Sequence, residues 1–427
     1  MIRIRNAVFL GWLFAAVGLN AQTLKIDDCY TGAEANYPLV KHYALIEKSK
    51  NFSVENAQKA YLPQFGIYGQ ATYQSDVTKI PIDFSNVSIP ALANVKMPEL
   101  PKDQYKVYAD VSYSLTNLVT NKNQTDLAKA NAEIETQKIE IELYKLRERI
   151  NALFFGVLVI DAQIAQTELV KEDIQNGIAR IETAVAGGVA LKSAADNLKA
   201  ELLKTKQRTT ELKAARKGYS DMLSLFIGAE IDEHTIFEKP LPPRLSNEIN
   251  RPEMRLYNLQ NRAFDLQNRT VSNRNLPQFN LFFQGGVGKP ALNMFSDSFD
   301  PYFVTGVRLS WNLSGFYTVK NERKQIAVNQ EGIHVQEEMF LFNTNLAVSQ
   351  QNTEITKMQE LIADDNAIIQ LRENVKKSAQ TQLDNGTATT NDYLTAVNAE
   401  DNARQSRILH EIQLLMYQYN KKTTLGN

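Results

Sequence analysis

The sequence repeats itself once, and this internal duplication constrains the fold more than any other feature. In the first part of each copy, matching residues lie 214 positions apart: Asn36, Pro38, Leu62, Pro63, Gln64 and Phe65 return as Asn250, Pro252, Leu276, Pro277, Gln278 and Phe279. Later the spacing becomes 198, for the pairs Ser112 and Ser310, Leu115 and Leu313, Gly188 and Gly386, and Gly228 and Gly426. One loop therefore changed length, between Asp76 and Gln104 in the first copy. Duplicated chains usually build symmetric assemblies.

The N-terminus has the composition of a secretory signal peptide. Arg3 and Arg5 precede a mostly apolar run from Ala7 to Leu19, and the small residue Ala21 follows. The run is too short to span a bilayer as a helix, which takes about 20 residues. We therefore expect residues 1–21 to be a cleaved signal peptide; the alternative is a buried N-terminal helix.

Charge and cysteine content exclude several classes of protein. The 47 basic and 48 acidic residues give a net charge of −1, so no basic field is present to hold a nucleic acid. Cys29 is the only cysteine, which excludes an intrachain disulfide and metal sites built from cysteine pairs. Because Ile26, Asp27 and Asp28 precede it instead of the small residues of a signal, we predict that Cys29 is not a lipid anchor.

Four segments alternate apolar and polar residues with a period of two, which predicts strands with one apolar and one polar face. They form two predicted hairpins, 62–116 and 276–313. The clearest segment places Val107, Ala109, Val111, Tyr113 and Leu115 against Lys106, Asp110, Ser112, Ser114 and Thr116. Strands of about 10 residues can cross a bilayer when tilted. Since membrane sheets must close into barrels of at least eight strands, a membrane sheet here requires several chains. The alternative is a half-buried sheet in a soluble protein.

Between the hairpins the apolar residues follow a heptad period. In the segment 121–186 they are Leu143, Leu146, Ile150, Leu153, Val157, Ile160, Ile164, Ile174, Ile178, Ile181 and Val185. This spacing predicts a long helix of roughly 100 Å that supercoils against its neighbours. We expect a return helix over 191–226 and a leading helix over 31–60. In the second copy, the long helix is predicted over 318–384 and the return helix over 390–422.

These elements divide the chain into a first structural repeat, 22–228, and a second, 249–427. Each repeat has a helix, a hairpin, a long helix and a return helix. The proline-containing segment 229–248 is predicted to be the connector. We expect it to lie in an equatorial belt, where Phe154 and Phe155 give the long helix a second apolar face.

The chain resembles the TolC-like outer-membrane efflux proteins, the outer membrane factors of tripartite pumps. The resemblance covers about Leu24 to Gly426 and rests on the doubled Leu-Pro-Gln-Phe strand start, the paired hairpins and the matched glycine turns. It implies a mainly α chain with transmembrane β-strands. Three such chains would form a homotrimer with a 12-stranded β-barrel in the outer membrane and an α-helical barrel in the periplasm.

The resemblance also implies a function and partners. The chain would be the passive exit duct of an efflux or type I secretion system, not an enzyme, and would need no cofactor. A periplasmic adaptor (membrane fusion protein) would open it, an inner-membrane transporter would supply the energy, and outer-membrane lipid would surround the barrel. The alternatives are a passive porin, which needs the strands but not the long helices, and a non-transport coiled-coil scaffold, which needs only the helices.

Candidate site residues follow from the same resemblance. The helix turns expected to dock the adaptor carry Gly188, Val189, Gly386 and Thr387. Asp392 would stand at the periplasmic aperture, with Asp364 and Asp365 as further charge, and Thr395 stands where the family pattern has a second acid. The alternative for Asp392 is a local role in capping the helix after the turn. The four histidines, His42, His234, His334 and His410, lack the spacing of a zinc site, so no metal is expected.

Overall fold

The computed structural model describes residues 23–77, 101–294 and 296–427. The predicted signal peptide and most of the loop between Asp76 and Gln104 lie outside the described residues.

The chain divides into two compact units, and each unit takes segments from both halves of the sequence. The sheet unit consists of Lys41–Glu140 and Pro252–Leu341. The helical unit consists of the described residues up to Val40, Ile141–Arg251 and Phe342–Asn427. Each unit therefore depends on both copies of the repeat.

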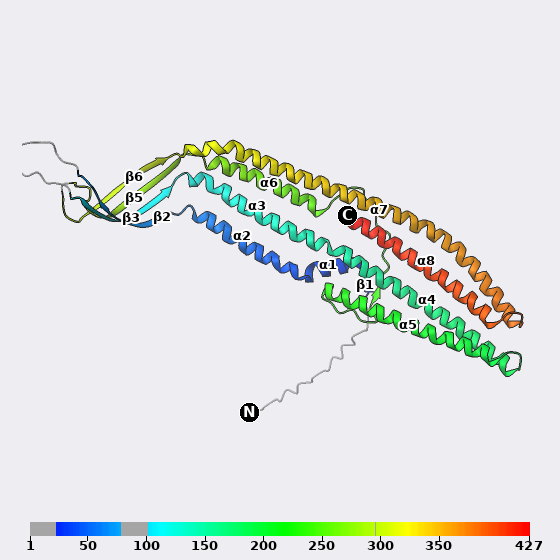
Figure 1. Ribbon diagram of the computed structural model, residues 1–427. Helices are drawn as coiled ribbons and strands as arrows, with labels where there is room; N and C mark the ends of the chain where they lie inside the picture. The colour runs from blue at the N-terminus through cyan, green and yellow to red at the C-terminus, as the bar shows by residue number, and fades with distance from the viewer. Residues whose placement is uncertain (1–22, 78–100, 295) are drawn as a thin grey trace, which may run out of the picture. The chain divides into compact units, whose positions relative to one another are not determined.

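Four long strands form one antiparallel sheet in the sheet unit (Figure 1). They are β2 (Gln64–Tyr73), β3 (Asp103–Ser114), β5 (Gln278–Lys289) and β6 (Asp300–Ser310). Their order is β2-β3-β5-β6, so the two hairpins join through β3 and β5. The strands have 10 to 12 residues, the length that a tilted strand needs to cross a bilayer. Strands β2 and β6 are the edges, and their outer sides have no strand partner among the described residues.

Thr116 joins the two hairpins at the end of the sheet that leads into the helices. Its Oγ1 donates to the carbonyl of Pro277 at 3.0 Å and accepts from the N–H of Phe279 at 3.0 Å. The N–H of Leu115 donates to the carbonyl of Phe279 at 2.8 Å. Leu115 and Thr116, at the end of the first hairpin, therefore hydrogen-bond to the Leu-Pro-Gln-Phe segment that begins the second hairpin.

Four helices flank the sheet in sequence. They are α2 (Lys41–Lys59), α3 (Asn117–Tyr144), α6 (Pro252–Asn273) and α7 (Phe316–Asp384). Within the sheet unit, α6 packs on α3 through Ala130, Ala263 and Leu266. Asn123 adds polar contacts, because its Nδ2 donates to Leu266 O at 3.1 Å and to Thr270 Oγ1 at 2.8 Å.

The helical unit is built around α4, which packs against α5 and α8 (Figure 1). Its elements are α1 (Ile26–Asn36), the short helix η1 (Pro38–Val40), α4 (Leu146–Ala186), α5 (Lys192–Ile227), α8 (Thr390–Leu425) and the end of α7. The predicted heptad residues supply the core, since Ile150, Val157 and Ile174 have no exposed surface. Among the described residues, one helical stretch, Asn117–Ala186, is long and apolar enough by composition to span a membrane. Its apolar residues in α4 are largely used by this core.

An aromatic cluster marks the middle of the helical unit. Phe154 and Phe155 on α4 are 0% and 1% exposed. Their ring centroids lie 5.3 Å from Phe237 of the connector and 5.4 Å from Tyr419 of α8, respectively. The connector is anchored by a two-residue parallel pairing of β1 (Thr23–Leu24) with β4 (Ile236–Phe237). The connector therefore packs on Phe154 through Phe237, and Phe155 packs on α8.

Two predicted helices are interrupted in the structure. The helix expected over 31–60 is instead α1 and α2, because Pro38 forces the preceding Tyr37 into an extended conformation with φ −61° and ψ 132°. The helix expected over 121–186 is interrupted at Lys145. That break is local, because Lys145 keeps helical dihedrals (φ −62°, ψ −20°) and its N–H still bonds Ile141 O at 3.1 Å.

Two asparagine–glycine contacts occur at equivalent places in the two copies. Asn36 at the end of α1 donates from Nδ2 to Leu225 O and Phe226 O of α5, each at 3.3 Å. In this first copy the α5 helix ends at Gly228. In the second copy the N–H of Asn250 donates to Leu425 O of α8 at 2.7 Å, just before Gly426. The return helices α5 and α8 therefore each end in contact with an asparagine that precedes the helix leading to a hairpin.

Candidate functional site

The turn between α4 and α5 is a glycine-capped helix end. Gly188 has a φ of +73°, a left-handed conformation that closes the turn. Its N–H donates to Val185 O at 3.0 Å, and the N–H of Val189 donates to Ala184 O at 2.9 Å. A Cβ on Gly188 would meet open space, so backbone conformation alone requires glycine. The Val189 side chain is 81% exposed, which leaves an apolar group at the tip of the turn.

The turn between α7 and α8 repeats these bonds 198 positions later. Gly386 has a φ of +71°, and its N–H donates to Leu383 O at 3.0 Å. The N–H of Thr387 donates to Gln382 O at 2.9 Å, and its Oγ1 donates to the same oxygen at 3.1 Å. The backbones of the two turns match, but one tip presents the valine and the other a threonine whose hydroxyl is already bonded.

Asp392 closes a capping box at the start of α8. Its N–H donates to Thr389 Oγ1 at 3.2 Å, while its Oδ2 accepts from the Thr389 N–H at 2.9 Å and from the Thr389 hydroxyl at 2.6 Å. These hydrogen bonds hold the pKa of Asp392 below its ordinary value, because they favour the charged carboxylate. Asp392 is exposed in the single chain. The local capping role is therefore present, whatever further role the charge has.

The turns rest on a shared apolar cluster from three helices. Its buried members are Val170, Ile174, Ile181, Ala195, Leu198, Tyr393, Leu394 and Val397, from α4, α5 and α8. Ion pairs connect the end of α7 to the helices that form this apolar cluster. Arg180 lies 3.1 Å from Asp384, and Lys376 lies 2.6 Å from Glu400 and 2.9 Å from Asp173. Although burial opposes the charge, hydrogen bonds to Asp173 and Glu400 raise the pKa of Lys376.

Asp364 and Asp365 have different surroundings in the structure. Asp365 is 6% exposed, and its Oδ2 lies 2.7 Å from Nδ1 of His410 on α8. Its carboxylate is therefore engaged within the helical unit, whereas Asp364 is exposed. Across the part of the chain that the structure describes, no group of three His, Cys, Asp or Glu side chains is placed to hold a metal ion.

The sheet has one apolar and one polar face, as the alternation predicts. Apolar-face side chains of β2 and β6 are strongly exposed, Ile67 by 84% and Phe303 by 67%. Large apolar side chains exposed as a contiguous face need a covering partner or lipid. On the polar face Gln284 donates to Asp110 at 2.7 Å, and Arg308 lies over the Phe282 ring at 4.6 Å.

Three tyrosines on the polar face were not found by sequence reasoning. The pairing register puts Tyr68 of β2 opposite Tyr108 of β3, Tyr108 opposite Gly286 of β5, and Gly286 opposite Tyr302 of β6. The alternation assigns each tyrosine to the polar face, but only strand pairing places them in one row across the sheet.

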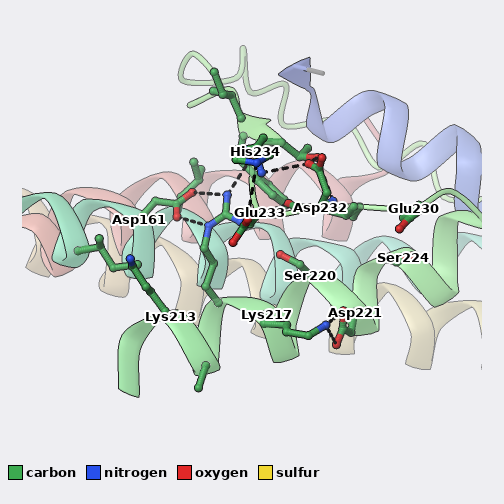
Figure 2. A pocket seen from close by; sticks show the side chains of 18 of the residues that line it. Asp161, Lys213, Lys217, Ser220, Asp221, Ser224, Glu230, Asp232, Glu233 and His234 are labelled. Atoms are coloured by element: carbon green, nitrogen blue, oxygen red, sulfur yellow. Dashed lines mark hydrogen bonds and ion pairs between the residues drawn. The ribbon is translucent and has the colours of Figure 1, made fainter. Parts of the chain in front are cut away.

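A cleft of about 1170 Å³ lies between the connector, α4 and α5 in the helical unit. Figure 2 shows Asp232, Glu233 and His234 of the connector on one side and Lys213 and Lys217 of α5 on the other.

Arg216 holds this cleft together. Its Nε donates to Asp161 Oδ1 at 2.6 Å and its Nη2 donates to Thr235 O at 2.8 Å, while the guanidinium lies 5.8 Å from the Phe237 ring centroid. These contacts fasten the connector to both helices, so we interpret the cleft as structural.

Comparison with protein-family models gives no match, and comparison with curated protein sequences gives none either. Solved structures do match. The outer membrane protein VceC from Vibrio cholerae aligns over 94% of this chain and 96% of its own, with 13% identity and a TM-score of 0.63. The Campylobacter jejuni CmeC outer membrane channel aligns over 100% and 94%, with 12% identity and a TM-score of 0.61. The Neisseria gonorrhoeae MtrE outer membrane channel, in its open state, aligns over 94% and 89%, with 13% identity and a TM-score of 0.62.

The chain therefore has the TolC-like fold of these outer-membrane channels. This confirms, for the single chain, the mainly helical TolC-like fold that the resemblance in the sequence implies. At such low identity the likeness establishes the fold and leaves residue roles to the chain's own geometry.

Proposed function

We propose that this chain is one third of an outer-membrane exit duct. The observation that carries the proposal is the four-stranded sheet on a chain that also has long coiled-coil helices. Its apolar face is exposed, and its two edges have no strand partner within the described residues. A sheet edge left open in lipid would carry unsatisfied backbone groups, so the sheet has to be completed by further chains.

Three copies of the sheet would give a closed 12-stranded barrel, and the helices would form an α-barrel in the periplasm. The apolar face would contact outer-membrane lipid and the polar face would line the lumen. The proposed signal peptide, residues 1–21, would deliver the chain to that location. Duplication of an ancestral repeat would account for the two hairpins and the two matched turns.

The duct is proposed to be passive. An inner-membrane transporter would supply the energy for efflux or type I secretion, and a periplasmic adaptor would couple the two. The exposed sheet argues against a coiled-coil scaffold, because such a protein has no use for an apolar sheet face. The length of α7, 69 residues, argues against a simple porin, which needs only its barrel.

The proposal is tested by isolating the mature protein from membranes. We expect an outer-membrane protein that migrates as a heat-labile trimer and forms ion-conducting channels in planar bilayers. A water-soluble monomer without affinity for detergent or lipid would contradict it.

The adaptor is proposed to dock at the turns that carry Gly188, Val189, Gly386 and Thr387. Both turns are regular, exposed and rigidly capped, and Val189 offers an apolar contact. A photo-crosslinking residue at Val189 should capture the adaptor in cells. Leu225 near the other end of α5 is a matched control, because its side chain is 80% exposed against 81% for Val189. Equal capture of the adaptor at both positions, or no capture at Val189, would contradict docking at the turns.

Asp392 is proposed to contribute to the charge at the periplasmic aperture. Its carboxylate is exposed and held ionised by Thr389, so three copies near a common axis would attract cations.

A further inference from the structure

Helix α6 packs on α3 inside the chain, and two ion pairs join these helices. Arg262 Nη1 lies 3.5 Å from Glu133 Oε2, and Arg255 Nη1 lies 3.9 Å from Glu140 Oε2. In each pair the arginine belongs to α6 and the glutamate to α3. Because β3 pairs with β5, the helix that follows β3 and the helix that precedes β5 are neighbours. This contact therefore shows how one copy of the repeat packs on the other.

Both ion pairs have equivalents of the same charge on α2 and α7. At the spacing of 214, the two arginines of α6 correspond to Lys48 and Lys41 of α2, in the order given. At the spacing of 198, the two glutamates of α3 correspond to Glu331 and Glu338 of α7. All four side chains are exposed, and Glu338 also lies 3.6 Å from Nε2 of His334 on its own helix. At these positions α2 and α7 are thus complementary in charge.

The next heptad step keeps this complementarity but reverses both signs. Continuing the antiparallel register by seven residues sets Arg269 of α6 against Asp126 of α3. Their equivalents are Glu55 of α2 and Lys324 of α7, both exposed. A change of sign on one helix is therefore matched by a change of sign on the other, which is how charges that face each other fix a register.

Between the charged positions, one apolar partner becomes larger and the other smaller. Inside the chain, Ile134 of α3 and Leu266 of α6 pack in one cluster. Their equivalents are Gly332 of α7 and Phe52 of α2. Phe52 is 62% exposed, and an added Cβ on Gly332 would meet nothing within 4 Å. Glycine weakens a helix interior relative to alanine, and a Phe52 ring from another chain against Gly332 accounts for a glycine there.

An asparagine of α3 also recurs on α7. Asn123 bonds two acceptors on α6, a backbone carbonyl and a side-chain oxygen. Its equivalent is Asn321 of α7, which is exposed. The equivalents of its two acceptors are the carbonyl of Phe52 and the side chain of Asn56 on α2.

The strand order separates α2 from α7 within one protomer. Helix α2 precedes β2, helix α7 follows β6, and these strands are opposite edges of the sheet. In a ring of copies, β6 of one protomer is completed by β2 of the next. The helices that follow and precede these strands then meet, as α3 and α6 do inside the chain. The other side of α7 is used by α6, since Gln330 donates to Asp265 at 3.0 Å.

We propose that α7 of one protomer packs on α2 of the next in the register that α3 and α6 use inside the chain. Lys48 pairs with the partner's Glu331, and Phe52 packs against the partner's Gly332. This inference rests on the proposed function, because it specifies a contact in the proposed trimer. Contacts between repeats then have the same form within and between chains, which lets a head-to-tail assembly close into a ring.

The test is photo-crosslinking from α2 in outer membranes. Phe52 is replaced by the photoreactive amino acid p-benzoylphenylalanine, and the products are separated on a denaturing gel and mapped by mass spectrometry. We expect a covalent dimer whose linkage lies within about one helical turn of the partner's Gly332. The matched control is the same replacement at Glu47, which is exposed on the other side of α2 and should give no dimer linked at α7. Replacement of Arg262 should link α6 to α3 within one chain, without a dimer.

An exchange of charges tests the register. Glu331→Lys should lower the temperature at which the trimer dissociates, because it sets a lysine against Lys48. Adding Lys48→Glu should restore that temperature, whereas adding Lys41→Glu, two turns away, should not. Gly332→Leu should reduce the yield of trimer, although the single chain has space for a side chain there.

The outcomes separate this inference from the proposed function. If conducting trimers form but the Phe52 linkage maps elsewhere, or both charge exchanges restore the trimer equally, the proposed register is wrong and the duct stands. If the linkage maps to the partner's Gly332 in a trimer that does not conduct, the contact stands and the exit duct fails. If no trimer forms at all, both fail.

Discussion

The four glycines with a left-handed conformation in the described part of the chain differ in what surrounds them. Gly188 and Gly386 lie at the helix turns, where an added Cβ would meet nothing within 4 Å. At Gly228 an added Cβ would lie 2.5 Å from Cγ of Asn36, and at Gly426 it would lie 2.5 Å from the backbone of Asn250. Gly188 and Gly386 therefore need to be glycine only because of their backbone conformation. Gly228 and Gly426 need to be glycine also because a side chain would have no space.

This difference predicts unequal costs for the same substitution. Gly188→Ala should lower the free energy of unfolding by about 1–2 kcal/mol, the cost of a left-handed alanine. Gly228→Ala should cost more, because it also pushes Asn36 away from the end of α5. Thermal unfolding followed by circular dichroism would compare the two variants, and equal losses would contradict the assigned role of the Asn36 contact.

Asp392 gives a prediction that depends on pH. Hydrogen bonds from Thr389 lower its pKa, so its negative charge persists below the ordinary pKa of 3.8 and is lost as the pH falls through the lowered value. The proposed cation preference of the channel should therefore persist into acid. Thr389→Ala should move the loss of preference to higher pH, and Asp392→Asn should weaken the preference at neutral pH.

Reversal potentials in planar bilayers measure this preference. If Asp392→Asn leaves selectivity unchanged, Asp392 serves as a helix cap only. Its stabilising effect on α8 follows the same sign, present above its unfolded pKa and lost below its folded one.

The sequence pointed to Asp392 and the turn glycines, whose roles at the aperture and in docking stay predictions, but it did not point to the tyrosine row. The turns are local, so their glycines are visible in the sequence spacing. Tyr68, Tyr108 and Tyr302 meet only through pairing across three strands, and the register of that pairing is not written in any one segment.

At the scale of elements, the aromatic cluster at Phe154 holds the connector onto α4. Phe154→Ala would leave a cavity among Phe155, Phe237 and neighbouring side chains, so we expect a loss of about 3–5 kcal/mol. Leu169→Ala on the same helix, at an exposed position, should cost far less. Denaturant unfolding would measure both. Similar losses would show that the cluster is not a centre of stability.

The periods of two and seven predicted which segments become strands and helices, because each period is set by the geometry of its element. Helix ends and breaks were harder to predict. Pro38 gives a local signal for the break between α1 and α2, whereas the interruption at Lys145 has no proline or glycine beside it. The pairing of β3 with β5 joins segments about 170 residues apart in sequence, and a periodic pattern does not specify such a partner.

At the scale of the whole molecule, the two faces of the sheet should tolerate charge differently. Val307 of β6 is on the apolar face and Val304 is on the polar face of the same strand. Val307→Lys should reduce the yield of membrane-inserted trimer, since a lysine facing lipid costs about 2–4 kcal/mol at the midplane. Val304→Lys should be tolerated.

Quantifying the heat-labile trimer in membranes tests this pair. Tolerance of both lysines would contradict a lipid-facing sheet, and loss of both would indicate that β6 accepts no charge on either side.

The strand edges at β2 and β6 have a genetic consequence. If each protomer pairs one sheet edge with each of its two neighbours, a defective protomer inactivates every ring that it enters. When equal amounts of normal and defective chain mix at random, only roughly one ring in eight contains three normal copies. Alleles that damage one edge while leaving the other able to pair should therefore be dominant, whereas alleles that abolish folding should be recessive.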